Sequence, residues 1–446
     1  MYEARPPLSR HSFVFFLFVL AAASAMPAEP PKVVRTIPAD GDYDVDPAAT
    51  EIRVEFDQDM SHDGHSICGG GDWFPKTTDK PRWESPRVFI MPVQLETDHD
   101  YGFNINCPSA MNFRNLTGES AVPYSLNFAT RGGTSDVSPE THQQSFKELR
   151  RLVDEEYSYR DVRDVDWSKL FDEFKDRMCV AATPQQFGRY AGRLLAAAQD
   201  IHISVMLGDR WFASFRRDVA ANANPRQLPN LIPNFKKQSN AVCTGRFDGN
   251  IGYILINTWK NGDSATYEPL YAALTEFADC PGLIIDVRFN SGGNESLAAE
   301  FAGCFVNEPI CYATHVYRDK DAPGGFTTPN KRTLSPTPNR PQYRGKIAVL
   351  TGPVVMSSCE AFLLMMKTVP NCKLVGAPSY GSSGNPRSHT LPNGVTVNLP
   401  SWKSMTPAGE CFEGRGVTPD IPVDADRSAF EKGDPVIEAA LEYLKK

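Results

Sequence analysis

A short polar cluster separates two apolar stretches in the last quarter of the chain. Residues 353–362 read PVVMSSCEAF; they follow the apolar run at 347–350 and lead into LLMMKTV, which is patterned as a helix. A strand that turns into a helix leaves unpaired N–H groups at the helix start, and these groups can bind an anion. Ser357 or Ser358 would be a well-placed nucleophile there, although either hydroxyl could simply cap the helix. We interpret the neighbouring thiol, Cys359, as a small buried residue of that helix.

A second candidate loop follows another apolar run. Residues 286–294 read DVRFNSGGN. Two consecutive glycines let the backbone approach other backbone closely, so that the N–H of Gly293 could point at an oxyanion formed during a reaction. A Gly-Gly pair after a strand is more often a plain turn. This loop therefore indicates a catalytic site only in combination with residues 353–362.

The elements that carry both loops predict an α/β core over residues 243–446. Short apolar runs alternate there with segments long enough to hold helices, which is typical of a mostly parallel sheet covered on both faces. Catalytic groups collect at the carboxyl ends of strands in such sheets. Both loops follow apolar runs and are therefore predicted at such ends. The runs lie at residues 251–256, 283–287, 347–350 and 374–376.

Two further parts precede the core. Residues 33–130 show strict alternation of apolar and polar residues between turn signals, which predicts an all-β sandwich. Apolar residues at helical spacing, with Ser-Pro and Thr-Pro starts, predict a helical subdomain over residues 138–205. Arg, Gly and Ser at residues 131–135 indicate a linker between them.

Composition and the N-terminus limit the class of protein. The formal net charge of −8 and the lack of a basic block argue against nucleic acid as a partner. Residues 1–25 combine a basic start, an apolar run and a small-residue cleavage site, which predicts a signal peptide and export to the periplasm or the outside. That run is too short to span a bilayer comfortably, so no stable membrane insertion is expected.

Ten cysteines are compatible with an oxidising compartment. We expect a disulfide between Cys68 and Cys107, which lie in the same predicted domain, and a local one between Cys304 and Cys311. Buried free thiols are the alternative for the others. The cluster of His62, His65 and Cys68 has spacing that could suit a metal, but we interpret it as a surface loop and expect no metal site.

Four motifs, in order from about residue 146 to the C-terminus, resemble the tail-specific (C-terminal processing) and tricorn-core serine peptidase family. VMSSCEAF is similar to the family's S-x-x-E segment, DVRFNSGGN to its D-[LV]-R-x-N-x-G-G, KLVGAPSYGSSG to its strand-and-glycine turn, and FEGRGVTPDIPV to its E-x-x-G-V-x-P-D-I ending. The resemblance implies a crotonase/ClpP-like core. Residues 33–130 resemble a bacterial immunoglobulin-like module, and residues 207–242 are too few for the PDZ domain of tail-specific members.

The resemblance also implies roles. It makes Ser357 the nucleophile and assigns the N–H groups of Gly293 and Ser358 to an oxyanion hole. Tail-specific members use a lysine as the base, but Ser382 stands at that position here. This departure points to the tricorn-like branch, which uses a histidine.

The histidine of that branch aligns with His202, in the segment QDIHIS, and the glutamate that orients it aligns with Glu413, with Glu410 as the runner-up. Ile201 and Ile203 replace a usual small residue and a usual hydroxyl, so a purely structural histidine is the alternative.

The resulting hypothesis is an exported serine endopeptidase that acts on proteins or peptides through a Ser-His-Glu triad. A serine is activated by an adjacent base, so this mechanism needs neither a metal nor an organic cofactor. The competing hypothesis is a non-catalytic peptide-binding or small-ligand-binding protein on the same scaffold, because folds also serve other functions. Retinoid-binding proteins of the eye, which resemble this family without proteolysis, are a precedent.

Overall fold

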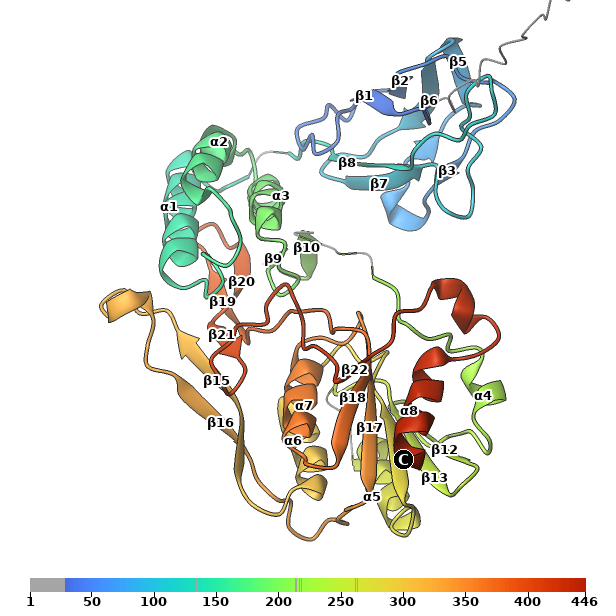
Figure 1. The fold of residues 1–446 in the computed structure, drawn as a ribbon. Coiled ribbons are helices and arrows are strands. Elements are labelled where there is room, and N and C mark those ends of the chain that lie inside the picture. Colours follow the sequence, from blue (N-terminus) through green and yellow to red (C-terminus); the bar gives the residue numbers. More distant parts are fainter. Residues whose placement is uncertain are drawn as a thin grey trace, which may run out of the picture. The chain divides into compact units, whose positions relative to one another are not determined.

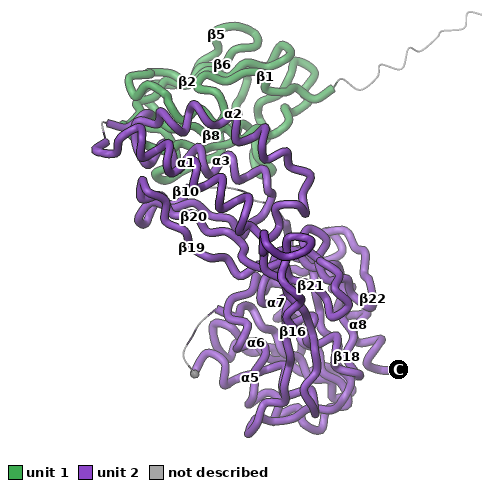
Figure 2. Tube along the Cα trace, turned by 90° about the vertical axis from the view of Figure 1, so that its left-hand side faces the viewer, with its two compact units in different colours: residues 1–130 green, residues 131–446 purple. Residues whose placement is uncertain are grey.

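The computed structural model describes residues 29–133, 135–212, 215, 217, 219–260, 262 and 264–446. The chain divides into two compact units, residues 1–130 and residues 131–446 (Figure 2). The predicted signal peptide lies outside the described residues. Within the described part of the chain, no helix is long and apolar enough to cross a bilayer.

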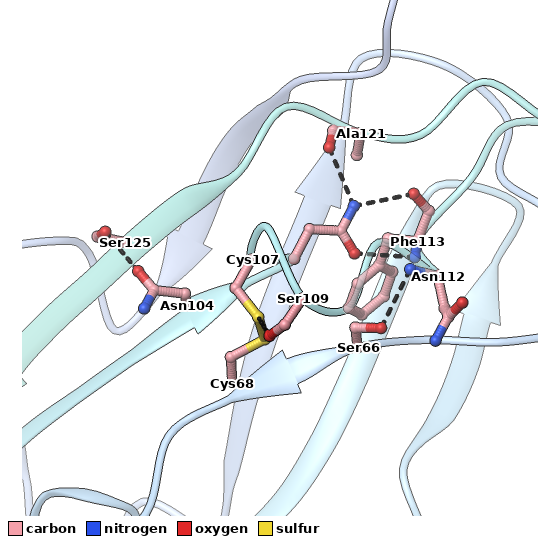
Figure 3. The surroundings of a disulfide bond; sticks show 10 residues. Ser66, Cys68, Asn104, Cys107, Ser109, Asn112, Phe113, Ala121 and Ser125 are labelled. Carbon is pink, nitrogen blue, oxygen red and sulfur yellow. Dashed lines mark hydrogen bonds between the residues drawn. A yellow bond between two sulfur atoms is a disulfide. The ribbon is translucent and has the colours of Figure 1, made fainter. Parts of the chain in front are cut away.

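The first unit consists of two antiparallel sheets that share one apolar core. Ile52, Val54 and Phe56 are buried in it, as their alternation with polar residues predicts. The predicted disulfide between Cys68 and Cys107 is present (Figure 3). One sheet has the order β1 (Val33–Ile37), β2 (Glu51–Phe56), β6 (Val88–Gln94) and β4 (Lys76–Thr77), with β5 (Arg82–Ser85) also on β6; the other has the order β3 (Ile67–Cys68), β7 (Asp100–Ile105) and β8 (Tyr124–Ala129).

The second unit is built on a seven-stranded mixed sheet. Its strands from β13 onward are parallel to one another, and β12 is antiparallel to β13 (Figure 1). The strand order is β11 (Lys236–Lys237), β12 (Val242–Phe247), β13 (Ile251–Ile256), β14 (Gly282–Asp286), β17 (Lys346–Thr351), β18 (Cys372–Gly376) and β22 (Ile421–Pro422). The α/β core that the sequence predicts is therefore present.

Helices cover both faces of this sheet. Alternate residues of a strand point to opposite faces, so Ile254 packs with one set of helices and Tyr253 with the other. The first set is α5 (Ser264–Glu276), α6 (Glu295–Ala302) and α7 (Ser358–Lys367); the second is α4 (Leu228–Leu231) and α8 (Pro435–Lys445). Both faces are thus buried, which is why the strands read as continuous apolar runs.

A smaller subdomain joins three helices to a sheet. The helices are α1 (Pro139–Glu155), α2 (Trp167–Cys179) and α3 (Pro184–Leu195), and Ser138 and Thr183 cap two of them through their side chains. The sheet has the order β10 (Arg210–Phe212), β9 (Ser204–Leu207), β20 (Thr396–Pro400) and β19 (Pro386–Thr390). The subdomain is therefore not confined to residues 138–205, because β19 and β20 come from the segment predicted as core (Figure 1).

A separate three-stranded sheet has the order β16 (Asn330–Leu334), β15 (Ile310–Tyr317) and β21 (Trp402–Met405). The predicted Cys304–Cys311 disulfide is wrong, since both thiols are free. The Sγ of Cys304 is buried in the core and donates to the carbonyl of Glu300, whereas the Sγ of Cys311 donates along β15 to Ala313. Two cysteines that are close in sequence form a disulfide only if their side chains point toward each other.

Candidate active site

Ser357 lies immediately before α7, after the carboxyl end of β17. Its backbone is in an unusual conformation, with φ 56° and ψ −129°, and its N–H donates to the carbonyl of Ser382 over 2.7 Å. Its side chain does not cap the helix. A non-glycine residue with positive φ is uncommon, and such strain gathers at functional sites. The hydroxyl is therefore held at the helix start but left available for other contacts.

His202 provides the main contact of that hydroxyl. Its Nε2 lies 3.1 Å from Ser357 Oγ, although the two residues are 155 positions apart in the sequence. The imidazole is largely buried, and this burial lowers its pKa, while the nearby carboxylate of Asp200 opposes the shift. A lowered pKa keeps the imidazole neutral at pH 7, which is the form that can accept a proton.

The other nitrogen of His202 faces a serine. His202 Nδ1 lies 2.8 Å from Ser382 Oγ, in the loop after β18. Asp200 Oδ1 lies 3.9 Å from Nδ1, beyond hydrogen-bonding distance, and it accepts instead from the backbone N–H of His202 over 2.9 Å. Tyr157 donates its hydroxyl proton to the second oxygen of Asp200 over 3.0 Å.

The predicted contact between Glu413 and His202 is not found. Glu413 Oε2 accepts from the backbone N–H of Ser383 over 3.1 Å, and Oε1 lies 3.8 Å from Arg163 without a hydrogen-bond partner among the described residues. The reason is that Ser382 already occupies the hydrogen-bonding position at Nδ1. Burial, together with the charge of Asp200, raises the pKa of Glu413 well above its usual value, which favours a protonated carboxyl.

The runner-up, Glu410, is exposed in the turn after β21. Sequence reasoning did not assign a role to Ser382, although a signal was present. A hydroxyl stands at the very position where tail-specific relatives hold their base, and that position must lie close to the nucleophile.

The glycine loop packs directly against the start of α7. Gly293 has φ 141°, and a Cβ there would lie 2.2 Å from the carbonyl carbon of Trp259. Ser358 donates its hydroxyl proton to the carbonyl of Gly293 over 2.6 Å. Within the described part of the chain, the N–H groups of Gly293 and Ser358 have no protein acceptor. Two free donors beside Ser357 can receive an oxyanion.

Glu360, in the first turn of α7, holds the Ser382 loop in place. Its Oε1 accepts from the Ser379 hydroxyl over 2.5 Å and from the N–H of Gly381 over 2.7 Å, and its Oε2 accepts from the N–H of Ser382 over 3.0 Å. Burial raises the pKa of Glu360 to about 7, and these hydrogen bonds limit the rise. The carboxylate of the S-x-x-E motif thus positions the backbone of Gly381 and Ser382.

A buried ion-pair network holds the glycine loop to the sheet. The guanidinium of Arg288 is completely buried and binds Asp286 over 2.7 Å and Asp434 over 2.9 Å. Asp434 also caps α8. Because removing one member of a buried ion pair leaves an unpaired charge, this network makes the loop's position costly to change.

Two residues that could have supported other chemistry have structural roles. Cys359 is fully buried, and burial raises the pKa of its thiol well above the usual value, so it is a poor nucleophile. Cys68 is in the disulfide, and the ring of His62 stacks on Trp83 with 4.6 Å between centroids. The described residues contain no cluster that could hold a metal.

Comparisons with known proteins agree with the motifs. Residues 250–423 match the model of Peptidase family S41, and residues 138–189 match the Tricorn protease C1 domain. The first match contains Ser357, whereas His202 falls between the two matched segments. The role of His202 therefore rests on the 3.1 Å between its Nε2 and Ser357 Oγ.

Individual relatives are distant. The chain is 28% identical to the Tricorn protease of Thermoplasma acidophilum over 202 residues, which are 45% of this chain and 17% of that protein. It is 26% identical to the carboxy-terminal processing protease CtpB of Bacillus subtilis over 175 residues, 39% of this chain and 34% of that protein. The match thus spans about a third or less of either relative's length.

Solved structures share the fold. A Parabacteroides merdae protein assigned as a peptidase superposes with a TM-score of 0.61 and 26% identity, covering 70% of this chain and 98% of that one. Mature CPAF, solved in complex with lactacystin, superposes with a TM-score of 0.51 at 12% identity, covering 69% of this chain and 97% of that one. The second likeness concerns the fold alone.

Proposed function

Because this chain belongs to the tail-specific and tricorn-like serine peptidases, we propose that it hydrolyses peptide bonds in proteins or peptides, with Ser357 as the nucleophile and His202 as the base. The observation that carries the proposal is the distance of 3.1 Å between His202 Nε2 and Ser357 Oγ. A serine hydroxyl needs such a base, since it is a weak nucleophile at neutral pH.

The reaction follows from this geometry. Ser357 Oγ attacks the peptide carbonyl carbon as His202 Nε2 takes its proton, and the carbonyl oxygen becomes an oxyanion. The N–H groups of Gly293 and Ser358 stabilise that oxyanion. His202 then returns the proton to the leaving amine, which leaves an acyl-enzyme, and a water molecule activated by the same imidazole hydrolyses it.

Glu413, the expected third member of the triad, is left out of the proposed mechanism. Glu413 does not reach His202, so we assign it no contact with the imidazole and a role in holding the backbone of Ser383.

Export remains part of the proposal. Its support is the signal-like composition of residues 1–25 and the disulfide between Cys68 and Cys107, since disulfides persist in oxidising compartments. The sandwich of residues 33–130, proposed as an immunoglobulin-like module, would act as a spacer or a binding module. Substrate selection would fall to it or to the surface around Ser357, since residues 207–242 are too few for a PDZ domain.

Labelling with a fluorophosphonate probe tests the proposal. This reagent reacts with activated serines, so we expect the full chain to be labelled and Ser357→Ala to abolish labelling. His202→Ala should slow it at least about a thousandfold. Matched controls are Ser388→Ala, on the exposed strand β19, and His62→Ala, in the first unit; both should label at the rate of the unaltered protein.

Two outcomes would contradict the proposal. An unlabelled full chain would favour the non-catalytic binding protein. Labelling that is unaffected by His202→Ala would remove the base assignment while leaving the serine in place.

A further inference from the structure

The far side of the His202 imidazole is occupied by a hydroxyl. Ser382 Oγ lies 2.8 Å from Nδ1, and Ser382 is only 1% exposed. The carboxylates nearby are engaged elsewhere. Asp200 accepts from the backbone of His202 and from Tyr157, and Glu413 accepts from the backbone of Ser383. Among the described residues, Ser382 is thus the group within hydrogen-bonding distance of Nδ1.

This contact decides which nitrogen of the imidazole can act as a base. A neutral imidazole carries one proton. If Nδ1–H donates to Ser382 Oγ, Nε2 has a free lone pair directed at Ser357 Oγ, 3.1 Å away. If instead the Ser382 hydroxyl donates to Nδ1, Nε2 holds the proton and cannot accept another from Ser357. The direction of one hydrogen bond therefore separates an active site from an inactive one.

Ser382 is also fixed through its backbone. Its N–H donates to Glu360 Oε2 over 3.0 Å, and its carbonyl accepts from the N–H of Ser357 over 2.7 Å. A single residue thus contacts the nucleophile's backbone and the imidazole. The Glu360 carboxylate, from the first turn of α7, holds this residue in place. Ser382 therefore links the backbone of Ser357 to the imidazole of His202 and helps to fix the distance between them.

We infer that Ser382 is the positioning residue of this active site, accepting a hydrogen bond from the Nδ1–H of His202 and keeping Nε2 unprotonated toward Ser357. The inference rests on the proposed function, and it replaces the carboxylate expected behind the histidine. The Nδ1 proton stays on the imidazole throughout, so Ser382 takes no proton during the reaction. When Nε2 accepts the serine proton, Ser382 Oγ goes on accepting from the Nδ1–H of the imidazolium.

A set of variants tests the role through reactivity. Ser382→Ala removes the acceptor with little change in volume and should slow fluorophosphonate labelling about ten- to a hundredfold, as expected for a lost hydrogen bond to a buried group. Ser382→Thr keeps an Oγ and should recover part of that loss. Ser383→Ala is the matched control, because its side chain makes none of the site's hydrogen bonds, and it should label within about twofold of the unaltered protein. Labelling of Ser382→Ala at the unaltered rate would overturn the inference.

A second readout does not depend on activity. In full-length protein carrying ¹⁵N-labelled histidine, the nitrogen shifts of His202 report which ring atom holds the proton, with His202→Gln supplying the assignment. We expect a protonated Nδ1 and an unprotonated Nε2, both in the unaltered chain and in Ser357→Ala. Ser382→Ala should give a mixture of the two tautomers. A protonated Nε2 in the unaltered protein would overturn the inference.

The two experiments separate the claims. An unlabelled chain whose His202 is protonated at Nδ1 would sink the proposed function and leave the positioning role of Ser382 standing. A labelled chain whose Ser382→Ala variant keeps both the labelling rate and the His202 tautomer of the unaltered protein would overturn the positioning role of Ser382. It would leave the proposed function standing.

Discussion

The imidazole of His202 lies 3.1 Å from the hydroxyl of Ser357 because a strand pair outside the main sheet brings it there. His202 lies two residues before the start of β9, and β9 pairs with β20, with Ser204 opposite Asn398. The loop that carries Ser382 leads into β19, which pairs with β20 in turn. The loops after the core strands supply the proposed nucleophile and oxyanion donors, and the segments that lead into this second sheet supply the proposed base and its proposed positioning residue.

The raised pKa of Glu360 predicts that activity and stability respond to pH in opposite directions. Only the carboxylate accepts from all three of its donors, so the labelling rate should fall as pH drops through about 7. The folded-state pKa is raised above the unfolded value, so the folded chain binds more protons between pH 4.5 and 7. The contribution of Glu360 to stability therefore grows as pH falls, by up to about 3 kcal/mol.

Labelling rates between pH 5 and 9 and melting temperatures of the same samples test this divergence. Glu360→Gln is the comparison. It should label more slowly and lose the dependence near pH 7, leaving only a decline at lower pH that comes from protonation of His202, whose pKa is lowered by burial. If Glu360→Gln had the same pH profile as the unaltered protein, ionisation of Glu360 would not matter for reactivity.

Replacement of Glu413 by Gln should leave the labelling rate within a few-fold, because Glu413 holds the backbone of Ser383 and does not contact the imidazole. The same change should stabilise the protein above pH 7. The raised pKa means that ionisation of this buried carboxyl costs stability as pH rises, and glutamine does not ionise. Melting temperature at pH 8, measured beside the labelling rate, checks both parts. A loss as severe as that of His202→Ala would restore Glu413 to the triad.

Local sequence patterns predict that the loops carrying Gly293 and Ser357 lie together. The contacts of His202 that sequence analysis did not predict depend on pairing between distant segments. Apolar runs of strand length predict a parallel sheet, and a parallel sheet places the loops carrying Gly293 and Ser357 at one edge. The distance from His202 to Ser357 depends on the pairing of β9 with β20, which no local pattern reveals. The choice between Ser382 and Glu413 depends on an atomic contact of 2.8 Å that residue types alone do not specify.

The predicted Cys304–Cys311 disulfide failed for a related reason. Both residues are close in sequence, but the buried Sγ of Cys304 contacts α6, whereas that of Cys311 contacts its own strand. The bridge between Cys68 and Cys107 succeeded because β3 pairs with β7, which brings distant segments side by side.

Gly293→Ala should damage catalysis more than it damages the fold. The new Cβ would meet the backbone of Trp259 at 2.2 Å, and φ 141° disfavours any side chain, so the loop must shift and carry the Gly293 N–H away from the oxyanion. Loss of one such donor costs about a hundred- to a thousandfold in rate. Gly409→Ala is the matched control, since it has a positive φ of 85° but open space around its Cβ. The Gly409→Ala chain should lose a similar amount of backbone freedom and keep the labelling rate of the unaltered protein. If Gly293→Ala labelled within tenfold of the unaltered protein, the oxyanion would have to be bound by donors other than the glycine loop.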